Sequence, residues 1–283
     1  VTSNKQTEDF ESMKVYISID MEGIAGVVNS EQGRMGNPEY ERARRLMTGE
    51  ANAAIQGALA GGADGVLVND SHGGMRNLLI EELHADSRIE LITGSPKPFS
   101  MVQGLDETYD VAFFVGYHAR AGTAYGILDH TFSGAMVAEV RLNGMPIGEV
   151  GLNAAFAGSF GVPVGLVTGD RAVCEEAQAL LGDGLQTVVI KEGYGRNAAR
   201  CLLPQEAQNR IRQAAERACA TPVHPFILDH PITLSLTFVN SAQADMAALI
   251  PGSRRLDGRR IEYVHQDYPV VYQVFRAMLK LAS

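Results

Sequence analysis

The feature that most constrains the fold is a strand–helix–strand pattern in the first third of the chain. Residues 14–20 (KVYISID) place a valine and two isoleucines on one face, as a strand does. Asn37 and Pro38 are a typical helix start, and the predicted helix continues over 39–60 until a glycine pair ends it. Residues 63–69 (ADGVLVN) then contain the short apolar run of a buried strand. This spacing predicts a βαβ unit and a mostly parallel sheet.

The rest of the chain extends this pattern with one interruption. Another buried strand is predicted at 110–116. Asn143-Gly144 favours a type I′ turn and predicts an antiparallel hairpin of residues 136–142 and 145–150. We therefore expect an α/β fold, with a mostly parallel central sheet flanked by helices, this hairpin, and a smaller C-terminal α/β part. After the hairpin, helices are predicted at 151–160, 171–181, 204–220 and 268–281, and strands at 162–168, 185–190, 232–239 and 261–265.

Domain limits follow from composition along the chain. Residues 1–12 (VTSNKQTEDFES) are polar and aperiodic, and we interpret them as a disordered leader with no role in the fold. Residues 13–283 contain no repeat or low-complexity tract and are expected to form a single unit. The three prolines within 221–231 mark a candidate subdomain boundary.

Charge, hydropathy and cysteine content exclude several classes of protein. The net charge of −9 argues against a nucleic-acid partner. No apolar run approaches the ~20 residues of a membrane helix, and the sequence shows no secretory signal, so no membrane association is expected. Cys174, Cys201 and Cys219 form no disulfide pattern, which indicates a reducing, cytoplasmic location. The chain also lacks GxSxG, GxGxxG and P-loop motifs, which disfavours serine nucleophiles and nucleotide binding.

Polar side chains collect where predicted strands end. Asp20 and Glu22 follow the first strand in D-M-E, His72 follows the second in N-D-S-H, and His118 follows the 110–116 strand in G-Y-H-A-R. Parallel strands end at one edge of the sheet, where open α/β folds bind their ligands. Each residue alone is more typical of a solvated turn or a surface histidine. Together, carboxylates and imidazoles suit zinc or a similar divalent metal.

Three further residues each have more than one interpretation. Glu149 is predicted at the end of the hairpin's second strand, in an apolar segment where a carboxylate must be paired or metal-bound. It is equally an acid at the N-terminus of the next helix. Asn153 supports Glu149, contacts a substrate, or faces solvent. His130, in L-D-H-T, is a proton shuttle or a simple loop residue, and its context alone favours the loop residue.

Six motifs occur in a fixed order between residue 13 and the C-terminus. They are SIDMEGIAG (18–26), YERARRLMTGEAN (40–52), VNDSH (68–72), KPFSMVQGLD (97–106), GYHARA (116–121) and GEVGLNA (148–154). In this set and order the chain resembles the zinc-dependent D-aminopeptidase family, also called the DppA-type or dipeptide transport operon D-aminopeptidases.

The resemblance implies two zinc ions at the edge of the sheet, held by five residues of this chain. Asp20 would bridge both metals, Glu22 and His118 would bind one zinc, and His72 and Glu149 would bind the other. Three carboxylates against two Zn²⁺ leave about one positive charge for a bridging hydroxide. Such a site lowers the pKa of bound water to around 7 and provides a nucleophile at cytoplasmic pH.

The same resemblance implies an activity, a catalytic residue and an assembly. The expected reaction is release of an N-terminal D-amino acid, such as D-Ala, from a short peptide, with His130 as the catalytic histidine. The expected assembly is a ring-shaped homo-oligomer, a decamer, whose interior chamber holds the active sites.

Two other functions stay open at this point. A metallohydrolase for L-peptides or other small amides would use the same metal residues and differ only in its pocket. A non-catalytic peptide-binding component of an importer would need a secretory signal or a lipobox cysteine, and the sequence shows neither.

Overall fold

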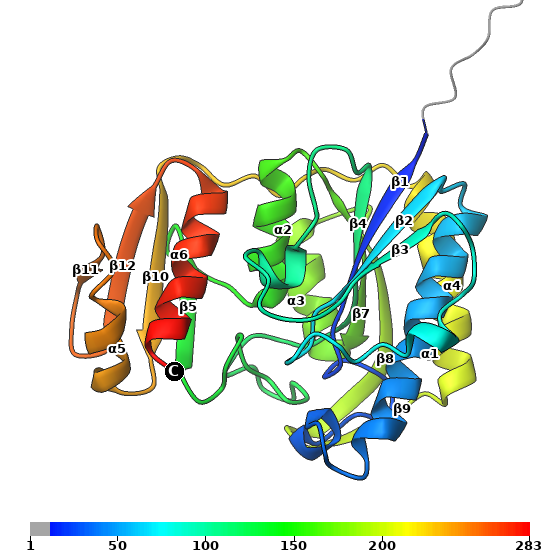
Figure 1. Cartoon of the computed structure of the whole chain (residues 1–283), viewed down its shortest axis with the longest axis horizontal. Coiled ribbons are helices and arrows are strands. Elements are labelled where there is room, and N and C mark those ends of the chain that lie inside the picture. Colours follow the sequence, from blue (N-terminus) through cyan, green and yellow to red (C-terminus); the bar gives the residue numbers. More distant parts are fainter. Residues whose placement is uncertain (1–11) are drawn as a thin grey trace, which may run out of the picture.

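The computed structural model describes residues 12–283 and contains two β-sheets with helices packed around them (Figure 1). The predicted leader lies outside the described residues up to residue 11. Six neighbouring strands of the larger sheet run parallel, and the seventh is an antiparallel edge strand. Its order is β3 (Ile89–Ile92), β2 (Gly65–Asp70), β1 (Lys14–Ile19), β4 (Val111–Tyr117), β7 (Val164–Asp170), β8 (Gln186–Gly195) and β9 (Ala198–Cys201).

Helices cover both faces of the larger sheet. On one face, α1 (Tyr40–Ala60) and α4 (Pro204–Ala220) pack against each other. On the other lie α2 (Glu149–Ser159) and α3 (Arg171–Leu181) (Figure 1). Strand β1 alternates accordingly: its valine and two isoleucines join the core beneath α1 and α4, whereas Tyr16 joins the core on the other face. The predicted mostly parallel sheet, flanked by helices, is confirmed.

The smaller sheet is antiparallel and includes the hairpin from the middle of the chain. Two helices, α5 (Ser241–Ala247) and α6 (Tyr268–Leu281), pack on this part of the molecule. Residues 221–231 connect α4 to this sheet. The strand order is β11 (Arg254–Arg255), β12 (Arg260–His265), β10 (Ile232–Phe238), β5 (Val137–Leu142) and β6 (Met145–Pro146).

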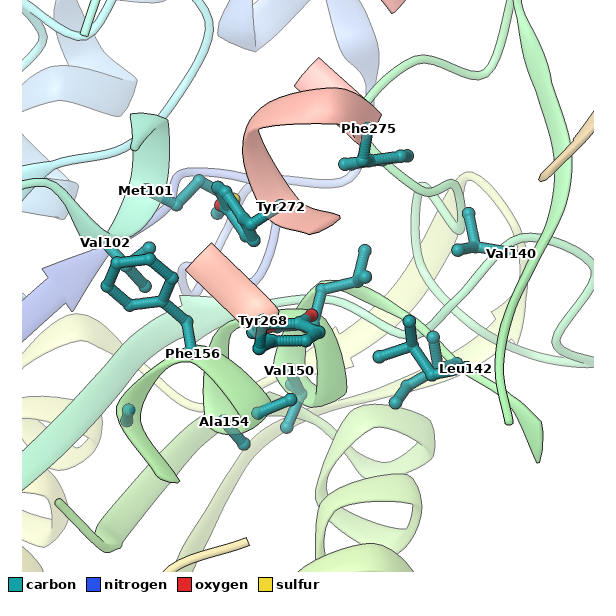
Figure 2. Close-up of a cluster of buried hydrophobic side chains, with 14 of the residues drawn as sticks. Met101, Val102, Val140, Leu142, Val150, Ala154, Phe156, Tyr268, Tyr272 and Phe275 are labelled. Atoms are coloured by element: carbon teal, nitrogen blue, oxygen red, sulfur yellow. The ribbon is translucent and has the colours of Figure 1, made fainter. Parts of the chain in front are cut away.

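Helix α6 connects the smaller sheet to the larger one through a shared apolar core. Figure 2 shows Tyr268 and Tyr272 of α6 beside Phe156 of α2, with Val140 and Leu142 of β5 close by. The rings of Phe156 and Tyr272 are 5.3 Å apart at their centroids. Burying side chains of this size contributes about 1.5–3 kcal/mol each, so the position of α6 is strongly fixed.

The hairpin differs from its prediction in two ways. Its second strand ends at Pro146 instead of residue 150, and α2 begins at Glu149, two residues before the predicted start. Ile147 N still donates to Val140 O at 2.9 Å, and the start of α2 at Glu149 ends the pairing. The hairpin also belongs to the smaller sheet. None of the helices within residues 12–283 is long and apolar enough to cross a membrane.

Candidate metal centre

The candidate ligands meet at the carboxyl edge of the larger sheet, as the strand-end pattern predicts. Asp20 follows β1, His72 follows β2 and His118 follows β4, while Glu149 is the first residue of α2. The segment after β1 lies directly against β4, where Asp20 N donates to Val115 O at 2.9 Å. Gly116 permits this approach, because it has φ +68° and a Cβ there would lie 2.4 Å from Asp20 O.

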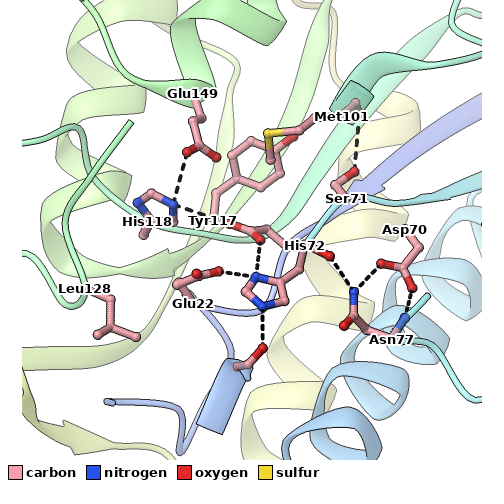
Figure 3. Close-up of polar contacts among 12 residues, drawn as sticks. Glu22, Asp70, Ser71, His72, Asn77, Met101, Tyr117, His118, Leu128 and Glu149 are labelled. Carbon is pink, nitrogen blue, oxygen red and sulfur yellow. Dashed lines mark hydrogen bonds and ion pairs between the residues drawn. The ribbon is translucent and has the colours of Figure 1, made fainter. Parts of the chain in front are cut away.

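One group of ligand atoms comes from Asp20, Glu22 and His72, and these atoms lie within 4.8 Å of one another. His72 Nδ1 is 2.7 Å from Glu22 Oε2 and 3.4 Å from Asp20 Oδ1 (Figure 3). His72 Nε2 donates to Gly33 O at 3.0 Å. A carbonyl only accepts, so Nε2 carries a proton and Nδ1 is the atom that faces the carboxylates.

The second group comes from His118, His130 and Glu149. His118 Nε2 lies 3.4 Å from Glu149 Oε1 and 3.5 Å from Asp20 Oδ2, and its Nδ1 donates to Ala119 O at 3.0 Å. Glu149 Oε1 also accepts from Phe132 N at 2.6 Å. Asp20 therefore lies between the groups, with one oxygen toward His72 and the other toward His118.

The side chains lie in a different pairing from the one that the resemblance implies. Glu22 is grouped with His72 and Glu149 with His118, whereas we expected Glu22 with His118 and His72 with Glu149. Figure 3 shows Glu22 beside His72 and Glu149 above His118. The sheet order explains the difference, because β1 lies between β2 and β4 and Glu22 turns toward the end of β2.

Two orphaned atoms test whether these residues fit a metal. Asp20 and His118 are buried, and Asp20 Oδ2 and His118 Nε2 have no hydrogen-bond partner among residues 12–283. Buried polar atoms without partners cost free energy, and a divalent cation between them would satisfy both. Carboxylate oxygens and imidazole nitrogens are the donors zinc takes. The residues therefore fit the metal that the resemblance implies.

The pKa shifts at the site also show that it favours bound protons or cations. Burial, reinforced by the charge of Glu22, raises the pKa of Asp20 to about 7. Burial alone would lower the pKa of His118, but Glu149 and Asp20 outweigh it and raise the pKa to about 10. Glu22 likewise raises the pKa of His72 against the effect of burial. Three carboxylates this close hold protons or cations tightly.

His130 faces the same site with one ring nitrogen. Its Nδ1 donates to Leu128 O at 2.7 Å, and its Nε2 lies 3.8 Å from Glu149 Oε1. The ring stacks on His118 with centroids 4.1 Å apart. Burial and the neighbouring His118 lower the pKa of His130, which favours a neutral ring with its lone pair on Nε2.

Asn153, a candidate substrate-binding residue, lies in the interior of the protein. Its side chain is fully buried, Nδ2 donates to Tyr117 Oη at 3.0 Å, and Oδ1 accepts from Tyr272 Oη at 2.9 Å. Both ends of the amide are therefore bonded to the protein. This placement supports a structural role, tying α2 to β4 and α6.

Two buried ionisable side chains that sequence reasoning missed hold the segment after β1. Lys191 Nζ donates to the carbonyls of Glu22, Ile24 and Val27 at 2.5, 3.0 and 2.6 Å. Glu50 Oε1 accepts from Ala25 N at 2.8 Å. The sequence offered two signals of buried polar side chains. Lys191 directly follows an apolar run, and Glu50 lies on the apolar face of a helix.

A cavity of about 330 Å³ reaches the metal centre. Asp20, Glu22, His72, His130 and Glu149 line it. The side chains that α6 contributes to its wall are Arg276, Leu279 and Lys280.

Comparisons with known proteins identify the family of this chain. The D-aminopeptidase family model (Peptidase_M55) matches residues 13–277. The D-aminopeptidase of Bacillus subtilis (strain 168) is 40% identical over 279 residues, covering 95% of this chain and 98% of that protein. A solved structure, the Zn-dependent D-aminopeptidase DppA from Bacillus subtilis, a self-compartmentalizing protease, superimposes with a TM-score of 0.91 at 39% identity over 95% of this chain and 98% of that one. The chain therefore belongs to the D-aminopeptidase family of peptidases, as its six motifs predicted.

Proposed function

We propose that this chain is a dinuclear zinc aminopeptidase that releases N-terminal D-amino acids, such as D-Ala, from short peptides. The observation that carries the proposal is the position of Asp20, whose two oxygens face two separate imidazoles. Zinc dependence and D-aminopeptidase activity are ascribed to the relatives described above, and the donor set of this chain suits the same metal.

In this proposal five side chains hold two zinc ions. Asp20 is shared, Glu22 and His72 complete one site, and His118 and Glu149 complete the other. When bound, the two ions activate a water molecule as the nucleophile and polarise the scissile carbonyl.

We assign proton transfer to His130, because the carboxylates of the site all serve as metal ligands in this proposal. The bond from Nδ1 to Leu128 O orients the ring and leaves Nε2 free to take the proton of the attacking water. The same nitrogen then delivers the proton to the departing amine. A neutral histidine suits this cycle, and the lowered pKa of His130 keeps it neutral before attack.

The cavity and the assembly complete the proposal. A cavity of about 330 Å³ suits a short peptide and is too small for a folded chain. We also propose a homo-oligomer, the ring-shaped decamer implied by the resemblance, because the solved relative is described as a self-compartmentalizing protease. A cytoplasmic location accords with three free cysteines within the described residues.

A paired assay of D-Ala-D-Ala and L-Ala-L-Ala, with zinc added, tests the reaction. The proposal predicts faster release of alanine from the D-peptide, and loss of this activity when zinc is removed with a chelator. Preference for the L-peptide would overturn the substrate assignment and favour the L-peptidase alternative. Full activity of the metal-free protein would overturn the zinc mechanism itself.

A further inference from the structure

The cavity above the metal centre has a cationic wall that the proposed chemistry does not use. Arg276 and Lys280 are four residues apart on α6 and therefore share one face of that helix. Both line the cavity that the metal ligands line, together with Leu279 from the same face. These two cations thus share one cavity with the metal centre.

Arg276 is held close to the ligand residues by an aromatic ring. Its guanidinium carbon lies 5.0 Å from the ring centroid of Phe132. The backbone of Phe132 in turn donates to Glu149 Oε1 at 2.6 Å. One residue therefore separates the guanidinium from a candidate metal ligand, and the stacking restricts the orientations that this long side chain can take.

Among residues 12–283, no ion pair involves Arg276 or Lys280, whereas Glu192 alone pairs with both Arg171 and Arg200. The acidic residues that line the cavity are the three candidate ligands, whose charge zinc would compensate. With metal bound, the α6 wall would be left positive, without an ion-pair partner among residues 12–283.

We propose that Arg276 and Lys280 bind the C-terminal α-carboxylate of the substrate, which makes this site selective for very short peptides with a free carboxyl end. The inference rests on the proposed function, in which the amino end of the peptide lies at the metals. Each further residue extends the peptide by about 3.5 Å, so the carboxylate of a di- or tripeptide stays within this small cavity. A guanidinium binds a carboxylate with two parallel hydrogen bonds, and the nearby ammonium adds a second charge.

The test compares D-Ala-D-Ala with D-Ala-D-Ala amide, which lacks only the terminal charge. We expect the wild-type protein to show a KM at least about 10-fold lower for the free acid. A 10-fold ratio corresponds to the free energy of one charge-assisted hydrogen bond. Arg276→Gln should raise the KM for the acid by about 10–100-fold, with kcat and all constants for the amide little changed. Lys280→Gln should act in the same direction more weakly, and Arg276→Lys should restore part of the preference.

Arg45→Gln is the matched control, because Arg45 is exposed on α1, does not line the cavity, and loses the same charge. Equal KM values for acid and amide in the wild-type protein would overturn the carboxylate site. An equal loss for both substrates in Arg276→Gln would overturn it too, since that pattern indicates a structural effect.

Failure of the proposed function is distinguishable from failure of this inference. If zinc-loaded protein hydrolyses neither peptide, the aminopeptidase assignment fails, and calorimetric titration with the same two peptides decides the carboxylate site. Tighter binding of the acid than the amide, lost in Arg276→Gln and kept in Arg45→Gln, would support the site. Equal binding of both peptides, or binding of neither, would overturn it.

Discussion

Asp20 is the residue on which both halves of the proposed metal centre depend. It follows β1, which lies between β2 and β4, so its two oxygens reach the histidines at the ends of both neighbouring strands. Glu22, two residues later, adds a second carboxylate on the β2 side. The D-M-E motif thereby supplies Asp20, which faces both histidines, and Glu22, which lies beside His72.

Replacement of His130 separates its role from that of the ligands. His130→Ala should keep the zinc content and lower kcat by ~10²–10⁴-fold, because the proton carrier is lost while the metals stay bound. His224→Ala, at an exposed histidine of the 221–231 connection, is the control. Metal analysis and steady-state kinetics on the two variants check this. Loss of zinc from His130→Ala would instead make His130 a ligand, and unchanged kcat would make it a simple loop residue.

Glu50 predicts a pH-dependent stability. Burial raises the pKa of this carboxyl to about 8, and nearby Lys191 offsets only part of the effect. Since the folded state holds the proton more tightly than the unfolded chain, the contribution to stability is complete at low pH and is lost as the pH rises. The loss is about 1.4 kcal/mol per pH unit between roughly pH 5 and pH 8.

Glu50→Gln mimics the protonated carboxyl and should remove this dependence. The melting temperature of the variant, relative to wild type, should rise steadily from pH 5 to pH 8 and then level off. Thermal melts of both zinc-loaded proteins across this range measure the difference. A difference that stays constant with pH would contradict the shifted pKa.

The strand-end pattern predicted four candidate ligands, and the structure brings all four together: Asp20, Glu22, His72 and His118. Both interpretations of Glu149 hold in part, because it is the first residue of α2 and is also buried beside His118. Which residues share a group could not be predicted, since it depends on the lateral order of strands.

Among the structural elements, the segment after β1 depends most on a single side chain. Lys191, on β8, is buried and donates to three carbonyls of residues 22–27. It was missed in the sequence because a lysine beside an apolar run is usually at a strand's exposed end. Its bonds fix the backbone of Glu22, so we infer that Lys191 is a positioning residue for this proposed ligand.

Lys191→Met retains the length of the side chain and removes its three donors. We expect zinc affinity at the Glu22 and His72 site to fall about 10–100-fold, as for other residues that orient ligands. Competition with a fluorescent chelator measures the affinity, and circular dichroism checks the fold. Lys14→Met, at an exposed lysine of β1, should leave affinity unchanged. Wild-type affinity in a folded Lys191→Met protein would refute the positioning role.

Helix limits were predictable where local chemistry sets them. The predicted spans 171–181, 204–220 and 268–281 match α3, α4 and α6. Asp170 caps α3 through Val173 N, and α4 and α6 have proline in their first turn. The missed strands β3, β9 and β11 are short and depend on pairing with other strands. The missed helix α5 has a local signal, the capping box of Asn240 and Gln243, but spans only 7 residues.

At the scale of the whole molecule, the proposed chemistry lies between the carboxyl edge of the larger sheet and α6. The larger sheet supplies Asp20, Glu22, His72 and His118 from its strand ends, and α6 from the C-terminal part supplies the facing wall of the cavity. Sequence analysis predicted a smaller C-terminal part. It did not predict that the hairpin of β5 and β6 completes that part, because sheet membership depends on contacts between distant segments.

The proposed assembly predicts a particle much larger than one chain. Light scattering at micromolar concentration and physiological salt should give a mass close to ten times the 30.4 kDa of one chain. Closed rings arise when identical interfaces repeat around an axis, so the mass should not grow further with concentration. A mass near 30.4 kDa would contradict any homo-oligomer, and a stable smaller multiple would contradict the decamer.

The zinc content of protein purified without chelator tests the dinuclear centre most directly. We predict close to two zinc ions per chain in the wild-type protein, about one in His72→Ala, and almost none in Asp20→Ala, because Asp20 is shared by both sites. The matching control, Asp64→Ala, changes an exposed carboxylate away from the centre and should retain both ions. One zinc per chain in the wild-type protein, or an Asp20→Ala variant that keeps both ions, would contradict the shared two-metal site.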